Sequence, residues 1–331
     1  MTRVHVVALG GTISMTSEDH GSLEPRLDAD QLLELLDGEV AGATTITTES
    51  PPPMPSANLT LDDIVGVVRR VHELLDAGDI DGAVVVQGTD TLEETAFVAD
   101  VLHTDRSEPL VFTAAMRAPD TLGTDAAANL AASMAVAASP DAAGHGVIVC
   151  MNDELHAARW VQKTHASSTA AFTSPTSGPI GHVVERRPRF RQRRSTQLDG
   201  IGPARLGADP ARVLLHRTFL GDDGRVISGA RQLGYDGVVV EAFGVGHLSV
   251  AAAHAAAGLA AQIPVVFASR ASVGSTFTDT YGFEGSERDL LRRGLIAAGS
   301  LDGLKARALL EIALSSEMDV ASLPELFAAW G

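Results

Sequence analysis

The sequence predicts an α/β protein with two domains. Short runs of apolar, largely β-branched residues alternate with segments of helical period, the pattern of parallel strands joined by right-handed crossovers. The chain has 331 residues, more than one hydrophobic core usually organises. Glycine and proline recur between 200 and 207, as in a linker. We therefore predict a larger N-terminal parallel-sheet domain at 1–194, a linker at 195–211 and a smaller C-terminal α/β domain at 212–331.

The elements of the first domain follow from these patterns in chain order. Apolar β-branched runs predict strands, and a period of 3.6 residues predicts the helices between them. The polar stretch 14–26 contains Gly21 and Pro25 and is interpreted as a mobile loop. The predicted strands are 4–9, 44–48, 83–86, 110–114 and 147–151, and the predicted helices are 28–36, 61–75, 92–102 and 125–138.

The same alternation begins again after residue 212 and predicts a second, smaller sheet. Lys305 opens one of its helices and is interpreted as structural. The predicted strands are 213–216, 238–242 and 265–268, and the predicted helices are 249–262, 305–315 and 323–329.

The net charge of −17 argues against sequence-independent nucleic-acid binding, which depends on cations that neutralise phosphates. One segment, 186–194, nevertheless has six arginines in nine residues around Pro188. Such a patch could bind nucleic acid. It lacks helical spacing, however, and the rest of the chain is acidic, so a solvated hairpin or linker is the favoured interpretation.

The cysteine and apolar content point to a cytoplasmic protein. Cys150 is the only cysteine, which excludes an intrachain disulfide, and its apolar surroundings predict a buried, inert thiol. No apolar stretch approaches the ~20 residues of a membrane helix, and no signal peptide is visible at the start. We expect no membrane partner.

Two predicted strands end in a glycine turn followed by a threonine. Gly10 and Gly11 precede Thr12, and Gly88 precedes Thr89 and Asp90. Glycine allows the backbone to turn sharply and to approach a ligand closely. Since open α/β sheets bind ligands at the carboxyl ends of their strands, two such turns indicate one shared site.

The alternative is that Thr89 and Asp90 only cap the following helix. Serine, threonine and aspartate are common at helix starts, and Thr91 with Glu94 three residues later fits a capping box. The presence of the second turn at Thr12 favours the site.

Lys163 is a candidate base for these hydroxyls. A threonine hydroxyl is a poor nucleophile until a base takes its proton, and amide hydrolysis also needs donors that stabilise the oxyanion. Only Lys163 and Lys305 are lysine among 25 basic residues, and a lysine can lose a proton where an arginine cannot. The alternative for Lys163 is a surface lysine in a pair of strands.

Other cofactor and metal patterns are weak or missing. The eleven histidines lack metal-ligand spacing, and no Gly-Lys pair indicates a P-loop. Gly244 and Gly246 follow a predicted strand, but Ser249 stands where a dinucleotide loop has its third glycine. We expect neither a metal nor a cofactor.

The sequence resembles the bacterial-type L-asparaginase/glutaminase family over almost its whole length. The two threonine motifs carry this resemblance, and further segments agree in order. The matching segments are ALGGTI at 8–13, QGTDTLEET at 87–95, AMR at 115–117, MND at 151–153, VQKT at 161–164, GVGHL at 244–248 and KAR at 305–307. The resemblance implies a flavodoxin-like N-terminal domain and hydrolysis of L-asparagine to L-aspartate and ammonia.

The resemblance also assigns roles in catalysis. Thr12 corresponds to the nucleophile that forms the acyl-enzyme. Thr89, Asp90 and Lys163 correspond to a second triad that polarises the hydroxyl or the attacking water, and Asp90 also binds the substrate's α-ammonium group.

Further residues correspond to the family's substrate-binding groups. Ser56 matches a serine that holds the α-carboxylate, although its neighbours differ from the commoner pattern, and the Ala115 backbone lines the amide end. Glu287 matches a carboxylate contributed by a neighbouring subunit, with Glu284 as the alternative. His247 stands where many relatives have asparagine, in the same second-subunit wall. The implied assembly is a homotetramer built as a dimer of dimers.

One departure separates this chain from the family pattern. Members usually carry a lid tyrosine in the loop after the first threonine, and 14–26 contains none. Turnover and affinity are therefore open, as is the preference for asparagine over glutamine. The alternatives are a glutaminase-asparaginase with comparable glutamine activity and a catalytically weak sensor that binds aspartate or asparagine.

Overall fold

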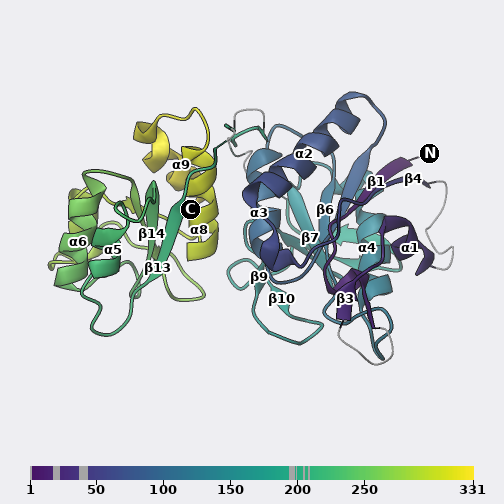
Figure 1. Cartoon of the computed structure of the whole chain (residues 1–331), viewed down its shortest axis with the longest axis horizontal. Helices are drawn as coiled ribbons and strands as arrows, with labels where there is room; N and C mark the ends of the chain where they lie inside the picture. Colours follow the sequence, from purple (N-terminus) through teal and green to yellow (C-terminus); the bar gives the residue numbers. More distant parts are fainter. Residues whose placement is uncertain are drawn as a thin grey trace. The chain divides into compact units, whose positions relative to one another are not determined.

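The computed structural model describes residues 2–17, 23–36, 44–193, 198, 200–203, 206–207 and 209–331. The chain divides into two compact units, residues 1–197 and 198–331. Figure 1 shows the helices and strands of both units with their labels. Each unit is a separate α/β structure with its own sheet and core, so each is described by itself.

The first unit is built on an eight-stranded sheet in the order β12-β11-β8-β7-β6-β5-β1-β4. Five neighbouring strands of this sheet, β4, β1, β5, β6 and β7, are parallel. Numbered by their order in the chain, they lie across the sheet as 2-1-3-4-5, which is the flavodoxin-like arrangement. Three antiparallel strands extend the other edge. The strands are β1 Thr2–Ala8, β4 Thr44–Glu49, β5 Gly82–Val86, β6 Leu110–Thr113, β7 Val147–Met151, β8 Glu154–Ala157, β11 Gly181–Val184 and β12 Arg187–Phe190.

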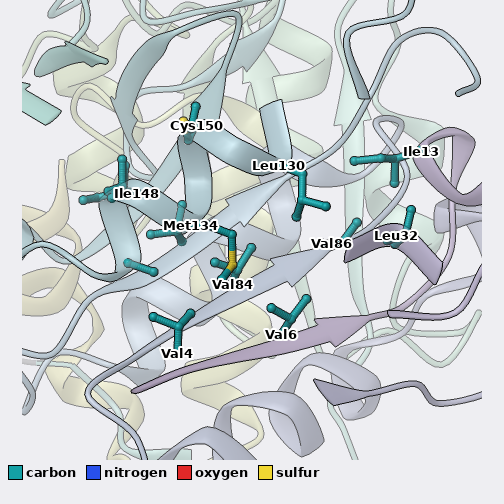
Figure 2. Close-up of a cluster of buried hydrophobic side chains, with 14 of the residues drawn as sticks. Val4, Val6, Ile13, Leu32, Val84, Val86, Leu130, Met134, Ile148 and Cys150 are labelled. Atoms are coloured by element: carbon teal, nitrogen blue, oxygen red, sulfur yellow. The ribbon is translucent and has the colours of Figure 1, made fainter. Parts of the chain in front are cut away.

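Helices cover both faces of this sheet. On one face, Val6 of β1, Val84 of β5 and Ile148 of β7 lie in one apolar cluster with Leu130 and Met134 of α4 (Figure 2). On the other face α3 packs against β6 and β7, and α2 packs against α3 (Figure 1). All five residues of β5 are buried, as expected for a central parallel strand. The helices are α1 Ala29–Glu34, α2 Leu61–Asp76, α3 Leu92–Leu102 and α4 Ala126–Ala137.

Two short antiparallel ribbons complete the first unit. They are β2 Met15–Ser17 with β3 Leu23–Pro25, and β9 Gln162–Lys163 with β10 Phe172–Thr173. The stretch 14–26, expected to be a mobile loop, contains this first ribbon, so both of its ends are paired strands; residues 18–22 lie outside the described part of the chain, and mobility stays a prediction.

The second unit has a four-stranded parallel sheet in the order β13-β14-β15-β16. Apolar residues of α6 and the strands, among them Val240, Ala253 and Phe267, form its core. The strands are β13 Val213–Arg217, β14 Gly237–Ala242, β15 Val265–Ser269 and β16 Ile296–Ala297. The helices are α5 Arg225–Gly229, α6 Val250–Ala260, α7 Glu287–Arg292, α8 Gly303–Leu314 and α9 Leu323–Trp330.

The α/β class with a larger parallel-sheet unit and a smaller second unit is confirmed, and the long apolar runs fall where they were predicted. The arginine-rich segment belongs to a hairpin, in which β11 pairs with β12. Of the expected linker at 195–211 a part lies outside the described residues. In the described part, the Gly207 N–H donates to the Ser315 carbonyl at 2.9 Å, so this segment packs within the second unit.

Two further features of the described residues bear on the early expectations. Cys150 is buried, and its burial raises the pKa of the thiol to about 12, so it is an inert core residue. Across the described ranges, no helix combines the length and apolar character required to cross a bilayer.

Candidate active site

The candidate site lies where the strand order of the first sheet reverses. β1 and β5 are neighbours, although β4 comes between them in sequence. Thr12 follows β1 in a 3-10 turn, η1 Thr12–Ser14, and Thr89 follows β5. The carboxyl ends of adjacent parallel strands at such a reversal are where open α/β sheets bind ligands.

The two threonine turns are in direct backbone contact. A Cβ atom placed on Gly11 would lie only 2.1 Å from the Gly88 backbone nitrogen, and Gly11 has a φ of +85°. Only glycine combines this close approach with this backbone conformation. The contact of Gly11 with Gly88 therefore holds Thr12 and Thr89 in neighbouring turns.

Ser56 joins the same group of turns from the segment after β4. It begins η2 Ser56–Asn58 and is buried. Its Oγ accepts a hydrogen bond from the Asp90 N–H at 3.2 Å, and its carbonyl accepts one from the Thr91 Oγ1 at 3.0 Å. The segments that follow β1, β4 and β5 thus meet at one place, through the Gly11–Gly88 contact and the bonds of Ser56.

The predicted capping box at Thr91 is wrong. Thr91 is the N-cap of α3, but its side chain makes no capping hydrogen bond, because the hydroxyl donates to Ser56 instead. A side chain that ordinarily stabilises its own helix here ties the Thr89 turn to the Ser56 turn.

Lys163 brings the second ribbon to these turns. Its Nζ donates to the Thr89 Oγ1 at 2.9 Å and to the Asp90 Oδ1 at 2.8 Å. The Lys163 side chain is 15% exposed, whereas the Asp90 side chain is 70% exposed. The structure therefore places Thr89, Asp90 and Lys163 together, and Lys163 is not an isolated surface lysine even though it lies in a strand pair.

Glu93 is a supporting residue that the sequence analysis did not single out. Its Oε2 accepts the Lys163 backbone N–H at 3.3 Å. Glu93 lies in the first turn of α3, three residues after Asp90, so the helix that follows the Thr89 turn also holds the backbone of Lys163. The two residues are 70 positions apart, and no local pattern could have paired them.

Ala115 lies just beyond the end of β6 and is buried. The next two backbone N–H groups, of Met116 and Arg117, donate to the carboxylate of Asp125. The turn after β6 is thus held by a buried side chain at the start of α4.

In the second unit Glu287 is fully buried at the start of α7. Its Oε1 accepts the backbone N–H groups of Thr280 at 2.9 Å and Tyr281 at 2.5 Å, and its Oε2 lies 3.3 Å from His247 Nε2. Burial raises the pKa of the Glu287 carboxyl, but the hydrogen bonds from Tyr281 and Thr280 outweigh it and hold the pKa below its usual value.

The neighbouring acidic residues have other partners. Glu284 is exposed and bonds to His254 Nε2 at 2.6 Å, while Asp289 pairs with Arg293 at 2.8 Å. His247 is one-quarter exposed and lies edge-on between the rings of Tyr281 and Phe283, with ring centroids 4.9 Å apart in each case.

Within the described ranges, no three histidine, cysteine, aspartate or glutamate side chains converge in a way that could hold a metal ion. The groups that the described residues gather at the first sheet are hydroxyls, a lysine, a carboxylate and backbone N–H groups.

Comparisons with known proteins agree over both units. Residues 3–196 match the family model described as Asparaginase, N-terminal, and residues 212–327 match that of the Glutaminase/Asparaginase C-terminal domain. An L-asparaginase of Bacillus licheniformis is 30% identical over 95% of this chain and 96% of its own length. A glutaminase-asparaginase of Pseudomonas fluorescens is 36% identical over 56% of this chain and 51% of its own length.

One solved structure and a further sequence relative also belong to L-asparaginases by their descriptions. A crystal structure described as a probable cytoplasmic L-asparaginase from Campylobacter jejuni superposes with a TM-score of 0.87 at 26% identity, covering 99% of this chain and 100% of that one. A relative from Haemophilus influenzae, 28% identical over 99% of this chain and 93% of its own length, is named a probable periplasmic L-asparaginase.

The contact between the two glycine turns leads to a first prediction. Gly11→Ala should destabilise the first unit by at least about 2–3 kcal/mol, because the new methyl group meets backbone that has no rotamer to change. The matched control is Gly66→Ala in α2, where nothing lies within 4 Å of the added Cβ and a gain of about 0.5–1 kcal/mol is expected. Urea unfolding followed by circular dichroism measures both; equal stability of the two variants would contradict the close contact.

Proposed function

Since this chain belongs to the asparaginase family and is an amidohydrolase, we propose that it hydrolyses L-asparagine to L-aspartate and ammonia through an acyl-enzyme on Thr12. The observation that carries the proposal is the pair of bonds from Lys163 Nζ to Thr89 Oγ1 and Asp90 Oδ1, beside the turn of Thr12. These bonds join a lysine to the hydroxyl of Thr89, whose turn is in backbone contact with the turn of Thr12.

In the first step the Thr12 hydroxyl oxygen attacks the carboxamide carbon and its proton moves to a base of the site. The tetrahedral intermediate collapses, the carbon–nitrogen bond breaks and ammonia leaves with the added proton. Backbone N–H groups at the turns stabilise the oxyanion, since preorganised donors at strand ends need no rearrangement when charge develops. Thr12 is then an ester of aspartate.

In the second step a water molecule attacks this ester. Lys163 is 2.9 Å from the Thr89 hydroxyl, so a proton can pass from the water through Thr89 to the lysine and back to Thr12 as it leaves. Asp90 is bound to Lys163 and yet largely exposed, which suits a carboxylate that also binds the substrate's α-ammonium group. Ser56 is proposed to hold the α-carboxylate, together with the N–H groups of its own turn.

The assembly is proposed to be a homotetramer, a dimer of dimers, in which Glu287 and His247 serve the site of a neighbouring copy. Glu287 is fully buried, whereas the His247 side chain is 24% exposed, so His247 is the more accessible of the two. Glu287 then orients the His247 ring and places a negative charge next to its Nε2 atom. Because the solved relative is described as cytoplasmic, the cytoplasm is the proposed location.

The test of the reaction is ammonia release from L-asparagine measured beside L-glutamine, since one relative is named a glutaminase-asparaginase. Thr12→Ala should lower kcat for asparagine at least about 10³-fold while L-aspartate still raises the melting temperature. Thr45→Ala, an exposed threonine of β4, is the matched control and should keep wild-type rates. Wild-type kcat in the Thr12 variant would exclude Thr12 as the nucleophile, and a wild type that binds aspartate without releasing ammonia would identify a sensor.

Lys163→Arg tests whether the lysine moves a proton or only provides charge. An arginine keeps the positive charge but cannot accept a proton at working pH, so kcat should fall about 10²–10⁴-fold, nearly as far as in Lys163→Ala. Steady-state rates of all three proteins give the comparison. If the arginine variant keeps a near-normal rate, Lys163 acts as a fixed charge and the proposed relay is wrong.

A shared site predicts complementation between inactive variants. Thr12→Ala and Glu287→Ala proteins should each be inactive, and mixing them under conditions of subunit exchange should restore activity in sites formed by two unmutated halves. Mass spectrometry of isotope-labelled subunits confirms the exchange. Mixed oligomers that stay inactive would place Glu287 outside the neighbour's site.

A further inference from the structure

Asp125 begins α4, but its carboxylate does not cap that helix. An aspartate at this position usually accepts a hydrogen bond from an N–H of the first helical turn. Here Oδ1 and Oδ2 accept the Met116 N–H at 3.1 and 3.0 Å, and Oδ1 accepts the Arg117 N–H at 3.0 Å. The side chain serves the turn after β6 in place of its own helix.

These bonds determine the direction of the Ala115 carbonyl. The Ala115 carbonyl and the Met116 N–H belong to one planar trans peptide unit, in which they point in opposite directions. Because the Met116 N–H points at Asp125, the Ala115 oxygen points away from Asp125. The carboxylate of one side chain thereby aims a backbone acceptor that it does not touch.

The carboxylate is itself held in place. The Asn129 Nδ2, one turn later on α4, donates to Asp125 Oδ2 and to the Ala114 carbonyl, both at 3.0 Å. The Asn129 Oδ1 accepts the Asn152 N–H at 2.9 Å, which adds the end of β7 to the network. Asp125 and Asn129 are both buried, so water does not compete for these bonds.

We propose that Asp125 is a positioning residue for recognition of the leaving amine: it directs the Ala115 carbonyl at the nitrogen of the substrate's carboxamide. This inference rests on the proposed function and on the assignment of the Ala115 backbone to the amide end, which the family resemblance implies. A carbonyl oxygen only accepts hydrogen bonds, so it favours a nitrogen that carries hydrogens and gains one more as it leaves. It gives nothing to an ester, whose leaving oxygen carries no hydrogen in the ground state.

The test compares an amide with an ester in one variant. Asp125→Asn keeps the shape of the side chain but replaces one acceptor oxygen by an NH₂ group, which meets the backbone N–H groups as donor against donor. The kcat for L-asparagine should fall at least about 10-fold more than the kcat for L-aspartic acid β-methyl ester. The KM of either substrate should change much less, because the Ser56 and Asp90 contacts remain.

Asp62→Asn is the matched control. It also removes one negative charge from the start of a helix, α2, and its side chain is exposed, so the amide-to-ester ratio should equal that of the wild type. Asn129→Ala leaves the Asp125 carboxylate in place but removes the amide that holds it, together with the bonds of that amide to the Ala114 carbonyl and the Asn152 N–H. It should lower the same ratio by a smaller factor. It replaces Asp125→Asn as the deciding variant if the latter is unfolded by circular dichroism.

Equal loss of amide and ester hydrolysis would overturn the inference, because it would mean that Asp125 supports the site as a whole. An unchanged ratio with unchanged rates would overturn it as well. Both outcomes leave the proposed function intact, whereas a wild-type enzyme that hydrolyses the ester but not asparagine would refute the proposed function and the role of Asp125 with it.

Discussion

The contact between Gly11 and Gly88 is the constraint on which the rest of the first unit's site depends. Two parallel strands that lie side by side bring their ends within about 5 Å, but side chains on the following turns would ordinarily keep those turns apart. A Cβ on Gly11 would sit 2.1 Å from the Gly88 nitrogen, and one on Gly88 would sit 2.6 Å from the Ser56 Oγ. Glycine at both positions lets the turns that carry Thr12 and Thr89 and the segment of Ser56 approach one another closely.

Lys163 bonds to the converging turns, but it comes from outside the main sheet. It lies on a two-residue strand of a small ribbon, where local backbone pairing alone gives little rigidity. Two sets of hydrogen bonds fix its position. The side-chain Nζ donates to the Thr89 and Asp90 side chains, and the backbone N–H donates to Glu93 in the first turn of α3. The short ribbon of β9 and β10 is thus held by the turn and helix that follow β5. These bonds keep the flexible Lys163 side chain at a fixed distance from the Thr89 hydroxyl.

The parts of the structure that the sequence predicted are those with a strong local signal. Apolar β-branched runs such as β5 and β7 and the helix α3 follow from period and burial alone. The short strands β8 to β11 were not predicted, because two to four residues with polar members carry no recognisable period. At the site, the sequence indicated Thr12, Thr89 and Lys163 by residue type and turn chemistry, whereas the partners of Glu93 and Glu287 depend on contacts that no local pattern encodes.

Two helices that begin next to the candidate site lack the side-chain N-cap hydrogen bond that their N-cap residue types usually make. In both, the side chain bonds to a neighbouring turn instead. Thr91 and Asp125 both occupy N-cap positions, and neither caps its helix. An N-cap hydrogen bond contributes about 0.5–2 kcal/mol to the free energy of unfolding, and one hydrogen bond between buried groups can contribute as much. Thr91 exchanges its cap for a bond to the Ser56 carbonyl, and Asp125 exchanges it for two backbone N–H groups of the turn after β6. Local helix stability is therefore given up at little net cost, and the two side chains instead hold the turns after β5 and β6, which belong to the candidate site.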